Sequence, residues 1–170
     1  MHWLETIAII LGSAAAVVIA YQDLRQRIVR LIPVLVVFVA GIVFAYGHRT
    51  PGQLLNLGIN AGLVTGILLM AGLILRLLKL PGFINRRIGL GDVLLFYAIA
   101  PWLPPLGFAL FLPSGMVILL TGVLLLMLSG RLAHDQPLPI AGGMTTCALI
   151  FVPLYYRFES DLLVAFGMTL

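Results

Sequence analysis

Two aspartates stand where charged residues meet long apolar stretches of the sequence. Asp23 follows the uncharged run 6–22, and Asp92 closes the sequence Gly89-Leu90-Gly91-Asp92 at the start of a later run. Ionisable groups at the border of a membrane span are costly, so they are the first candidates for chemistry. Two carboxylates that lie close together do not both ionise fully, so one can deprotonate a water while the other protonates a carbonyl oxygen. Such a pair hydrolyses a peptide bond without a metal or a cofactor, and we expect neither here.

Each aspartate also has a purely structural explanation. Asp23 could be a charge at the membrane interface that pairs with Arg25 or Arg27, and Asp92 could cap the N-terminus of a helix after a glycine-rich turn. Gly89 and Gly91, which flank Asp92, would suit substrate binding because a backbone without Cβ atoms lets an extended peptide approach closely. The residues alone leave both explanations open.

The composition determines which solvent surrounds these residues. Of 170 residues, 62% are apolar and only 9% are charged, compared with roughly 25% charged in a soluble domain. The mean hydropathy is +1.16, which excludes a soluble globular protein. With about 20 residues per membrane span, the chain has no room for a separate soluble domain. We therefore expect residues 1–170 to form one integral-membrane domain.

Prolines and charges predict where the membrane spans begin and end. The uncharged runs cover 6–22, 31–47, 50–75, 93–130 and 136–156. The run 93–130 is too long for one span, and the turn Trp102-Leu103-Pro104-Pro105 divides it into spans of 90–102 and 106–129. The pattern therefore predicts an all-α polytopic membrane protein with about six transmembrane helices.

Basic residues predict the orientation of this bundle. Eight of the ten Lys and Arg residues fall in the loops after the first, third and fifth spans, namely Arg25, Arg27, Arg30, Arg76, Lys79, Arg86, Arg87 and Arg131. Basic loops stay in the cytoplasm, so both termini should lie outside, and both aspartates should lie at cytoplasmic helix ends where they can meet. Topology and lipid head groups then explain the net charge of +4, and no nucleic-acid partner is expected.

The predicted span 50–75 carries three glycines at four-residue spacing, Gly58, Gly62 and Gly66. Small residues at this spacing form a groove that lets another helix approach closely, and the amides of Asn56 and Asn60 could form hydrogen bonds across it. We interpret the pattern as ordinary helix packing.

The two aspartate motifs resemble those of a known family. Gly89-Leu90-Gly91-Asp92 is similar to the Gly-x-Gly-Asp signature of intramembrane aspartyl proteases, and Asp23-Leu24-Arg25-Gln26-Arg27 resembles the first-aspartate motif of bacterial type IV prepilin leader peptidases. The stretch Pro137-Leu138-Pro139-Ile140-Ala141-Gly142-Gly143 is similar to the entry of that family's last span. The resemblance implies that Asp23 and Asp92 are catalytic. It further implies a substrate that is the leader of a pilin-like or pseudopilin precursor, cleaved at the cytoplasmic face of the bacterial inner membrane.

Two departures from the family pattern leave an alternative open. The family usually has Ile-Pro-Asn after the first aspartate, where this chain has Ile28-Val29-Arg30-Leu31, and a lysine two residues after the second, where this chain has Leu94. The alternative is a catalytically inactive homologue or a non-enzymatic membrane assembly component.

Cysteine and histidine usage narrows the chemistry further. Long family members also methylate the new N-terminus and carry an insertion with paired cysteines, whereas this chain has only Cys147 and no such insertion, which indicates cleavage without N-methylation. His2, His48 and His134 lie in different termini or loops, so no metal site is expected.

Overall fold

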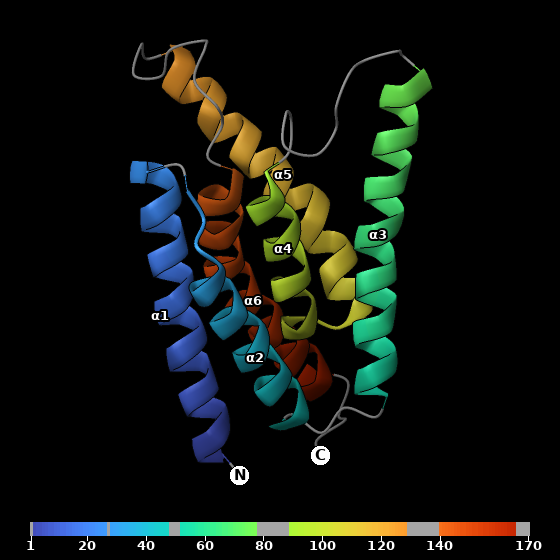
Figure 1. Cartoon of the computed structure of the whole chain (residues 1–170). Helices are drawn as coiled ribbons and strands as arrows, with labels where there is room; N and C mark the ends of the chain where they lie inside the picture. The colour runs from blue at the N-terminus through green and yellow to red at the C-terminus, as the bar shows by residue number, and fades with distance from the viewer. Residues whose placement is uncertain (1, 27, 48–51, 78–88, 129–139, 166–170) are drawn as a thin grey trace.

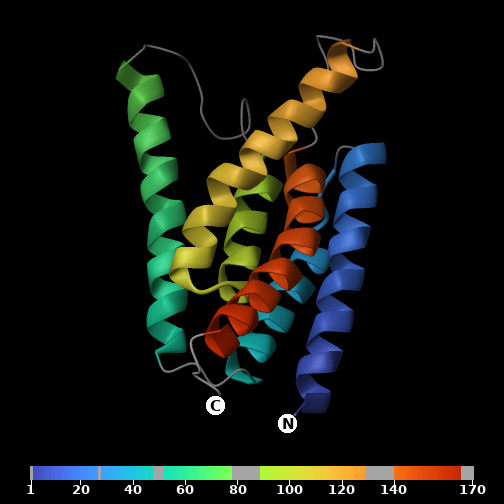
Figure 2. The same cartoon turned by 180° about the vertical axis from the view of Figure 1, so that it is seen from behind.

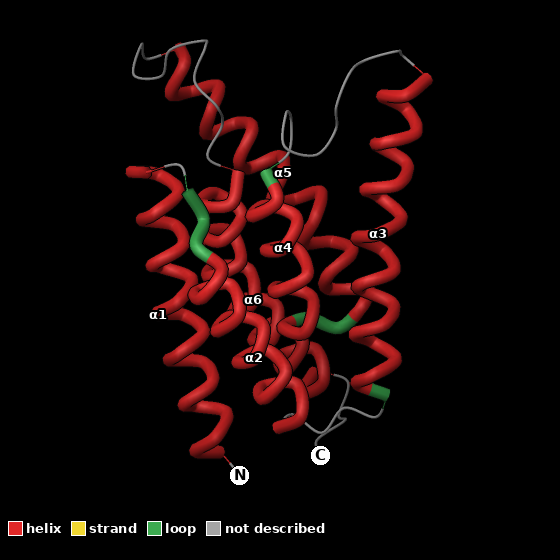
Figure 3. The backbone as a smooth tube through the Cα atoms, in the orientation of Figure 1, coloured by secondary structure: helices red, strands yellow, loops and turns green. Residues whose placement is uncertain are grey.

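A computed structural model describes residues 2–26, 28–47, 52–77, 89–128 and 140–165 (Figures 1 and 3). Across these ranges the chain forms helices and no strand, which confirms the predicted all-α class. In chain order the elements are α1 (His2–Gln26), α2 (Leu31–Gly47), α3 (Gln53–Leu77), α4 (Leu90–Ile99), the 3-10 turn η1 (Ala100–Trp102), α5 (Pro105–Leu128) and α6 (Ile140–Ala165).

The helices have the length and the apolar surface of a membrane protein. Three segments, Trp3–Gln26, Leu55–Ile74 and Pro105–Gly122, are long and apolar enough to cross a bilayer, and Leu31–Gly47 and Leu90–Trp102 are shorter apolar helices. Large aliphatic side chains are exposed on each of α1 to α6. Such a surface is stable in hydrocarbon and costly in water.

Helix ends group at two opposite ends of the bundle (Figure 1). The start of α1 and the end of α6 lie at one end, while the end of α1 and the starts of α2, α4 and α6 lie at the other. Arg25, Arg30 and Arg76 belong to this second end, as the loop pattern predicts. The remaining basic loop residues, Arg27, Lys79, Arg86, Arg87 and Arg131, lie outside the described residues.

The predicted short span 90–102 turns back inside the bundle. Helix α4 has 10 residues and η1 has 3, which gives about 20 Å of length against a hydrocarbon core of about 30 Å. Irregular backbone at membrane depth must be satisfied by protein groups. The Asn60 amide donates hydrogen bonds of 2.8 Å to the carbonyls of Ala100 and Leu103, and the Tyr156 hydroxyl donates one of 3.1 Å to the carbonyl of Trp102.

Asn60 therefore forms the hydrogen bonds between helices that its position predicts, whereas the glycines of α3 do not pack as predicted. A Cβ added at Gly58, Gly62 or Gly66 would meet no atom of the described residues within 4 Å. The glycine face of α3 points away from the other helices because the opposite face carries Asn60 and the buried Val64.

Close helix packing occurs instead around the Trp102 side chain. Gly12 of α1 and Gly41 of α2 lie against the indole, and a Cβ at Gly41 would come within 2.6 Å of Trp102 Nε1. That Nε1 donates a 2.9 Å hydrogen bond to the carbonyl of Val37, and the ring stacks on Phe44 at a centroid distance of 5.3 Å. Trp102 thus joins the α4–α5 turn to α1 and α2.

Candidate active site

Asp23 lies in the last turn of α1 and points into the bundle. Its side chain is only 6% exposed, and its Oδ2 accepts a 2.6 Å hydrogen bond from the backbone N–H of Gly142. Gly142 is the third residue of α6, and the first four N–H groups of a helix have no partner inside the helix. The start of α6 therefore supplies both a donor and the positive end of the helix dipole to Asp23.

Asp92 lies in the first turn of α4, three residues after the N-cap Gly89. Its Oδ2 accepts a 3.1 Å hydrogen bond from the backbone N–H of Gly89, so the carboxylate reaches back to the helix start. The helix-capping explanation of Asp92 is thus partly correct, although Gly89 is the N-cap. The same carboxylate also interacts with the backbone N–H of Ala141 and with the charge of Asp23.

The start of α6 brings the two aspartates together. Ala141 faces Asp92 and Gly142 faces Asp23. The two carboxylates are close enough for the charge of Asp23 to act on Asp92. Residues that are 69 positions apart in the sequence (23 and 92) therefore form one pair.

Arg25 was one of two predicted partners for Asp23. Its guanidinium instead donates a hydrogen bond to the Tyr21 hydroxyl and lies 5.6 Å from the centroid of the Tyr21 ring. The other predicted partner, Arg27, lies outside the described residues.

The glycines before Asp92 have packing roles in the structure. A Cβ at Gly91 would come within 2.8 Å of the Val29 Cβ, so this glycine lets the segment between α1 and α2 lie against the start of α4. A Cβ at Gly89 would lie 3.1 Å from Asp92 Oδ2, and Gly89 itself is exposed beside the carboxylate. Contact of Gly89 and Gly91 with a substrate stays a prediction.

The residues that depart from the family pattern lie at the start of α2 and within α4. Arg30 and Leu31 are exposed at the start of α2. Leu94 is partly buried against the apolar core. Side chains two residues apart on a helix do not face each other, so Leu94 points away from the Asp92 carboxylate. Both carboxylates keep their backbone donors despite these departures.

Sequence reasoning did not identify Ala141 and Gly142 as donors to the aspartates. The available signal was the glycine-containing start of the last span, whose prolines Pro137 and Pro139 lie outside the described residues.

Two of the three histidines, His48 and His134, also lie outside the described residues. Within the described ranges, no three His, Cys, Asp or Glu residues gather where they could hold a metal ion.

The structure thus joins two aspartates at one end of a bundle of apolar, membrane-type helices. The type IV leader peptidase family matches residues 10–130, a range that covers more than half of the chain and both aspartates. The chain belongs to the type IV leader peptidase family. No curated protein and no solved structure gave a significant match to the chain.

Proposed function

We propose that the protein is an aspartic endopeptidase of one membrane domain, residues 1–170, that cleaves the leader of pilin-like or pseudopilin precursors without methylating the product. The observation that carries the proposal is the pairing of Asp23 and Asp92 at the start of α6. Its cleavage site would lie at the cytoplasmic face of a bacterial inner membrane, with both termini in the periplasm, because the aspartates share the bundle end with Arg25, Arg30 and Arg76.

The pair supplies both proton transfers that peptide hydrolysis needs. The ionised aspartate takes a proton from water as the water oxygen bonds to the carbonyl carbon, and the protonated aspartate donates its proton to the carbonyl oxygen. When the tetrahedral intermediate collapses, a hydroxyl on the carbon returns its proton to the second aspartate as the carbonyl re-forms. The carbon–nitrogen bond breaks, and the leaving amine takes up the proton that the first aspartate removed from water. The amides of Ala141 and Gly142 favour the negative charge that the pair must carry.

Cleavage of a precursor in membranes tests the proposal. We expect Asp23→Asn and Asp92→Asn each to abolish cleavage, because asparagine keeps the shape but cannot transfer the proton, and acid–base catalysis contributes about 10²–10⁴ in rate. Precursor and product are resolved by gel electrophoresis, and the amount of membrane-inserted protein is measured in parallel. Glu5→Gln is the matched control, because Glu5 lies near the start of α1, at the far end of the bundle. Substantial cleavage by either aspartate variant would remove that residue from the mechanism, and no cleavage by the native protein would favour the non-enzymatic alternative.

A further inference from the structure

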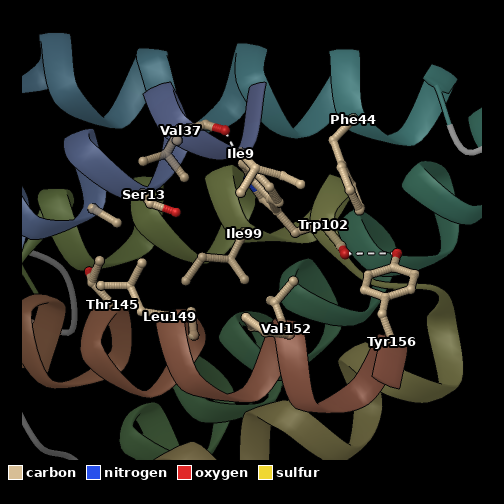
Figure 4. A pocket seen from close by; sticks show the side chains of 14 residues that line it. Ile9, Ser13, Val37, Phe44, Ile99, Trp102, Thr145, Leu149, Val152 and Tyr156 are labelled. Atoms are coloured by element: carbon tan, nitrogen blue, oxygen red, sulfur yellow. Dashed lines mark hydrogen bonds between the residues drawn. The ribbon is translucent and has the colours of Figure 1, made fainter. Parts of the chain in front are cut away.

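An apolar cavity of about 350 Å³ lies between α1, α2, η1 and α6 (Figure 4). The wall contains the polar side chains of Ser13, Trp102, Thr145 and Tyr156, and all of these except Ser13 are already hydrogen-bonded to other groups among the described residues. Trp102 Nε1 donates to the carbonyl of Val37, the Tyr156 hydroxyl donates to the carbonyl of Trp102, and the Thr145 hydroxyl donates to the carbonyl of Ala141. A buried water needs two to four polar partners, so this cavity suits an apolar occupant.

The cavity lies on the helix faces that carry the aspartates. Ala16 in its wall precedes Asp23 by seven residues, and Ile99 follows Asp92 by seven. Seven residues are close to two helical turns, so each pair shares a face with a separation of about 10 Å. Ile19 and Leu95, which are 0% and 1% exposed, occupy the intervening turn.

The cavity opens to the outside of the bundle between α1 and α6. Ile9 of α1 and Pro153 of α6 line it and are exposed. The two helices meet at the Asp23–Gly142 hydrogen bond and lie further apart towards the other end of the bundle (Figure 2). In a bilayer this opening faces hydrocarbon, so an occupant enters sideways from the membrane.

We infer that this cavity binds apolar side chains of the precursor, from a membrane-embedded segment that directly follows the bond to be cleaved. The inference rests on the proposed function and adds a substrate-binding site to it. A helix is about 10 Å across, too wide for the cavity, whereas a cavity of about 150 Å³ accommodates benzene. The space therefore holds about two large apolar side chains of a helix that lies along the gap between α1 and α6.

The geometry favours a substrate helix over a lipid chain as the occupant. The Asp23–Gly142 contact closes the gap at one end, so a helix in the gap ends beside the two carboxylates. The peptide bond that precedes this helix then reaches the catalytic pair, while its first apolar turns cover the cavity. The binding of a lipid chain would not depend on how the gap is aligned with the two carboxylates.

Two measurements test the inference. The first measurement uses the Asp92→Asn protein, so that the precursor is not cleaved. A photo-crosslinking amino acid replaces either Val152, which lines the cavity, or Leu154, which lies outside it and is 60% exposed. In the otherwise native protein, Ala148→Phe fills the cavity, and Ala14→Phe places the same side chain on the exposed face of α1.

We expect the probe at position 152, but not at 154, to crosslink to the apolar segment of the precursor. Ala148→Phe should lower kcat/KM for cleavage by about tenfold or more, and Ala14→Phe should stay within about twofold of the native value. Two results would overturn the inference: crosslinking of position 152 only to lipid in the presence of precursor, or a native kcat/KM in Ala148→Phe. If the native protein still cleaves the precursor in that case, the proposed function is unaffected. If the native protein cleaves no precursor, the proposed function fails, and the crosslinking at position 152 still decides the binding site.

Discussion

Asp23 on α1 and Asp92 on α4 both interact with backbone N–H groups at the start of a third helix, α6. The N–H of Gly142 lies 2.6 Å from Asp23 Oδ2, and the N–H of Ala141 interacts with Asp92. A helix N-terminus carries about half a positive charge, which offsets part of the repulsion between the two carboxylates. The start of α6 is therefore part of the candidate site, together with the aspartates.

Replacement of Gly142 by alanine should slow cleavage without preventing folding. A Cβ at this position would lie 3.1 Å from Asp23 Oδ2 and 3.2 Å from the Ala20 carbonyl oxygen, so the carboxylate or α6 must shift. Because misplacement of a catalytic group by about 1 Å can cost 10²-fold, we expect a large drop in kcat, measured in the precursor cleavage assay. Gly122→Ala is the control, since a Cβ there would meet nothing within 4 Å in the part of the chain that the structure describes. Equal rates for the two variants would contradict the role of Gly142.

The pH dependence of cleavage should be bell-shaped. At low pH both carboxylates are protonated and no base remains to activate water, and at high pH both are ionised and no acid remains to protonate the carbonyl oxygen. Initial rates of cleavage across the carboxylate range measure this profile. A metal chelator should leave the rates unchanged, because a carboxylate pair needs no metal ion. A flat profile, or a loss of activity on chelation that added zinc reverses, would contradict the aspartyl mechanism.

At the scale of elements, the α4–η1–α5 turn positions Asp92 from inside the bundle. The turn is anchored by Asn60 of α3, which is fully buried and donates to the carbonyls of Ala100 and Leu103. Trp102 fixes the same turn against α2 through the Val37 carbonyl. These contacts hold α4 at a set height, so that its first turn meets the start of α6.

Asn60→Ala should destabilise the protein by leaving two buried carbonyls without a donor. Each unsatisfied buried group costs about 1–3 kcal/mol, so the midpoint of thermal unfolding in detergent micelles should fall. Asn56→Ala is the matched control on the same helix, because Asn56 is only half-buried, and its effect should be within about 0.5 kcal/mol. Equal unfolding midpoints for the two variants would show that the amide of Asn60 does not stabilise the turn.

At the scale of the whole molecule, the aspartates and the described basic residues Arg25, Arg30 and Arg76 share one end of the bundle, and the start of α1 and the end of α6 share the other. Basic segments are retained in the cytoplasm. A reporter fused after Leu80 should therefore be active on the cytoplasmic side, and one fused at the C-terminus on the periplasmic side. Alkaline phosphatase and green fluorescent protein fusions distinguish the two sides. Cytoplasmic signals at both positions would contradict the topology and the cytoplasmic location of the cleavage site.

The sequence alone predicted the helices and most of their ends. Hydrophobic runs and prolines are local signals, so the span 31–47 matches α2 and the Trp102–Pro105 turn separates α4 from α5 as expected. The uncharged run 6–22 is shorter than α1, because the helix continues through charged residues to Gln26 and carries Asp23 in its last turn. The prediction that the glycines of α3 form a helix-packing groove was wrong for the described helices. Spacing shows which residues share a face of a helix, but not which face contacts a neighbouring helix.

Only the tertiary structure decided how the two aspartates meet. The motifs identified Asp23 and Asp92 as candidates. The amide of Gly142 that donates to Asp23, and that of Ala141 that interacts with Asp92, have no side-chain signature in the sequence. Likewise, the apolar residues around the cavity look like any other core positions until α1, η1 and α6 are packed. Type and periodicity of residues are local properties that determine helices, whereas the pairing of groups 69 to 119 positions apart (23 with 92, and 23 with 142) depends on how those helices pack.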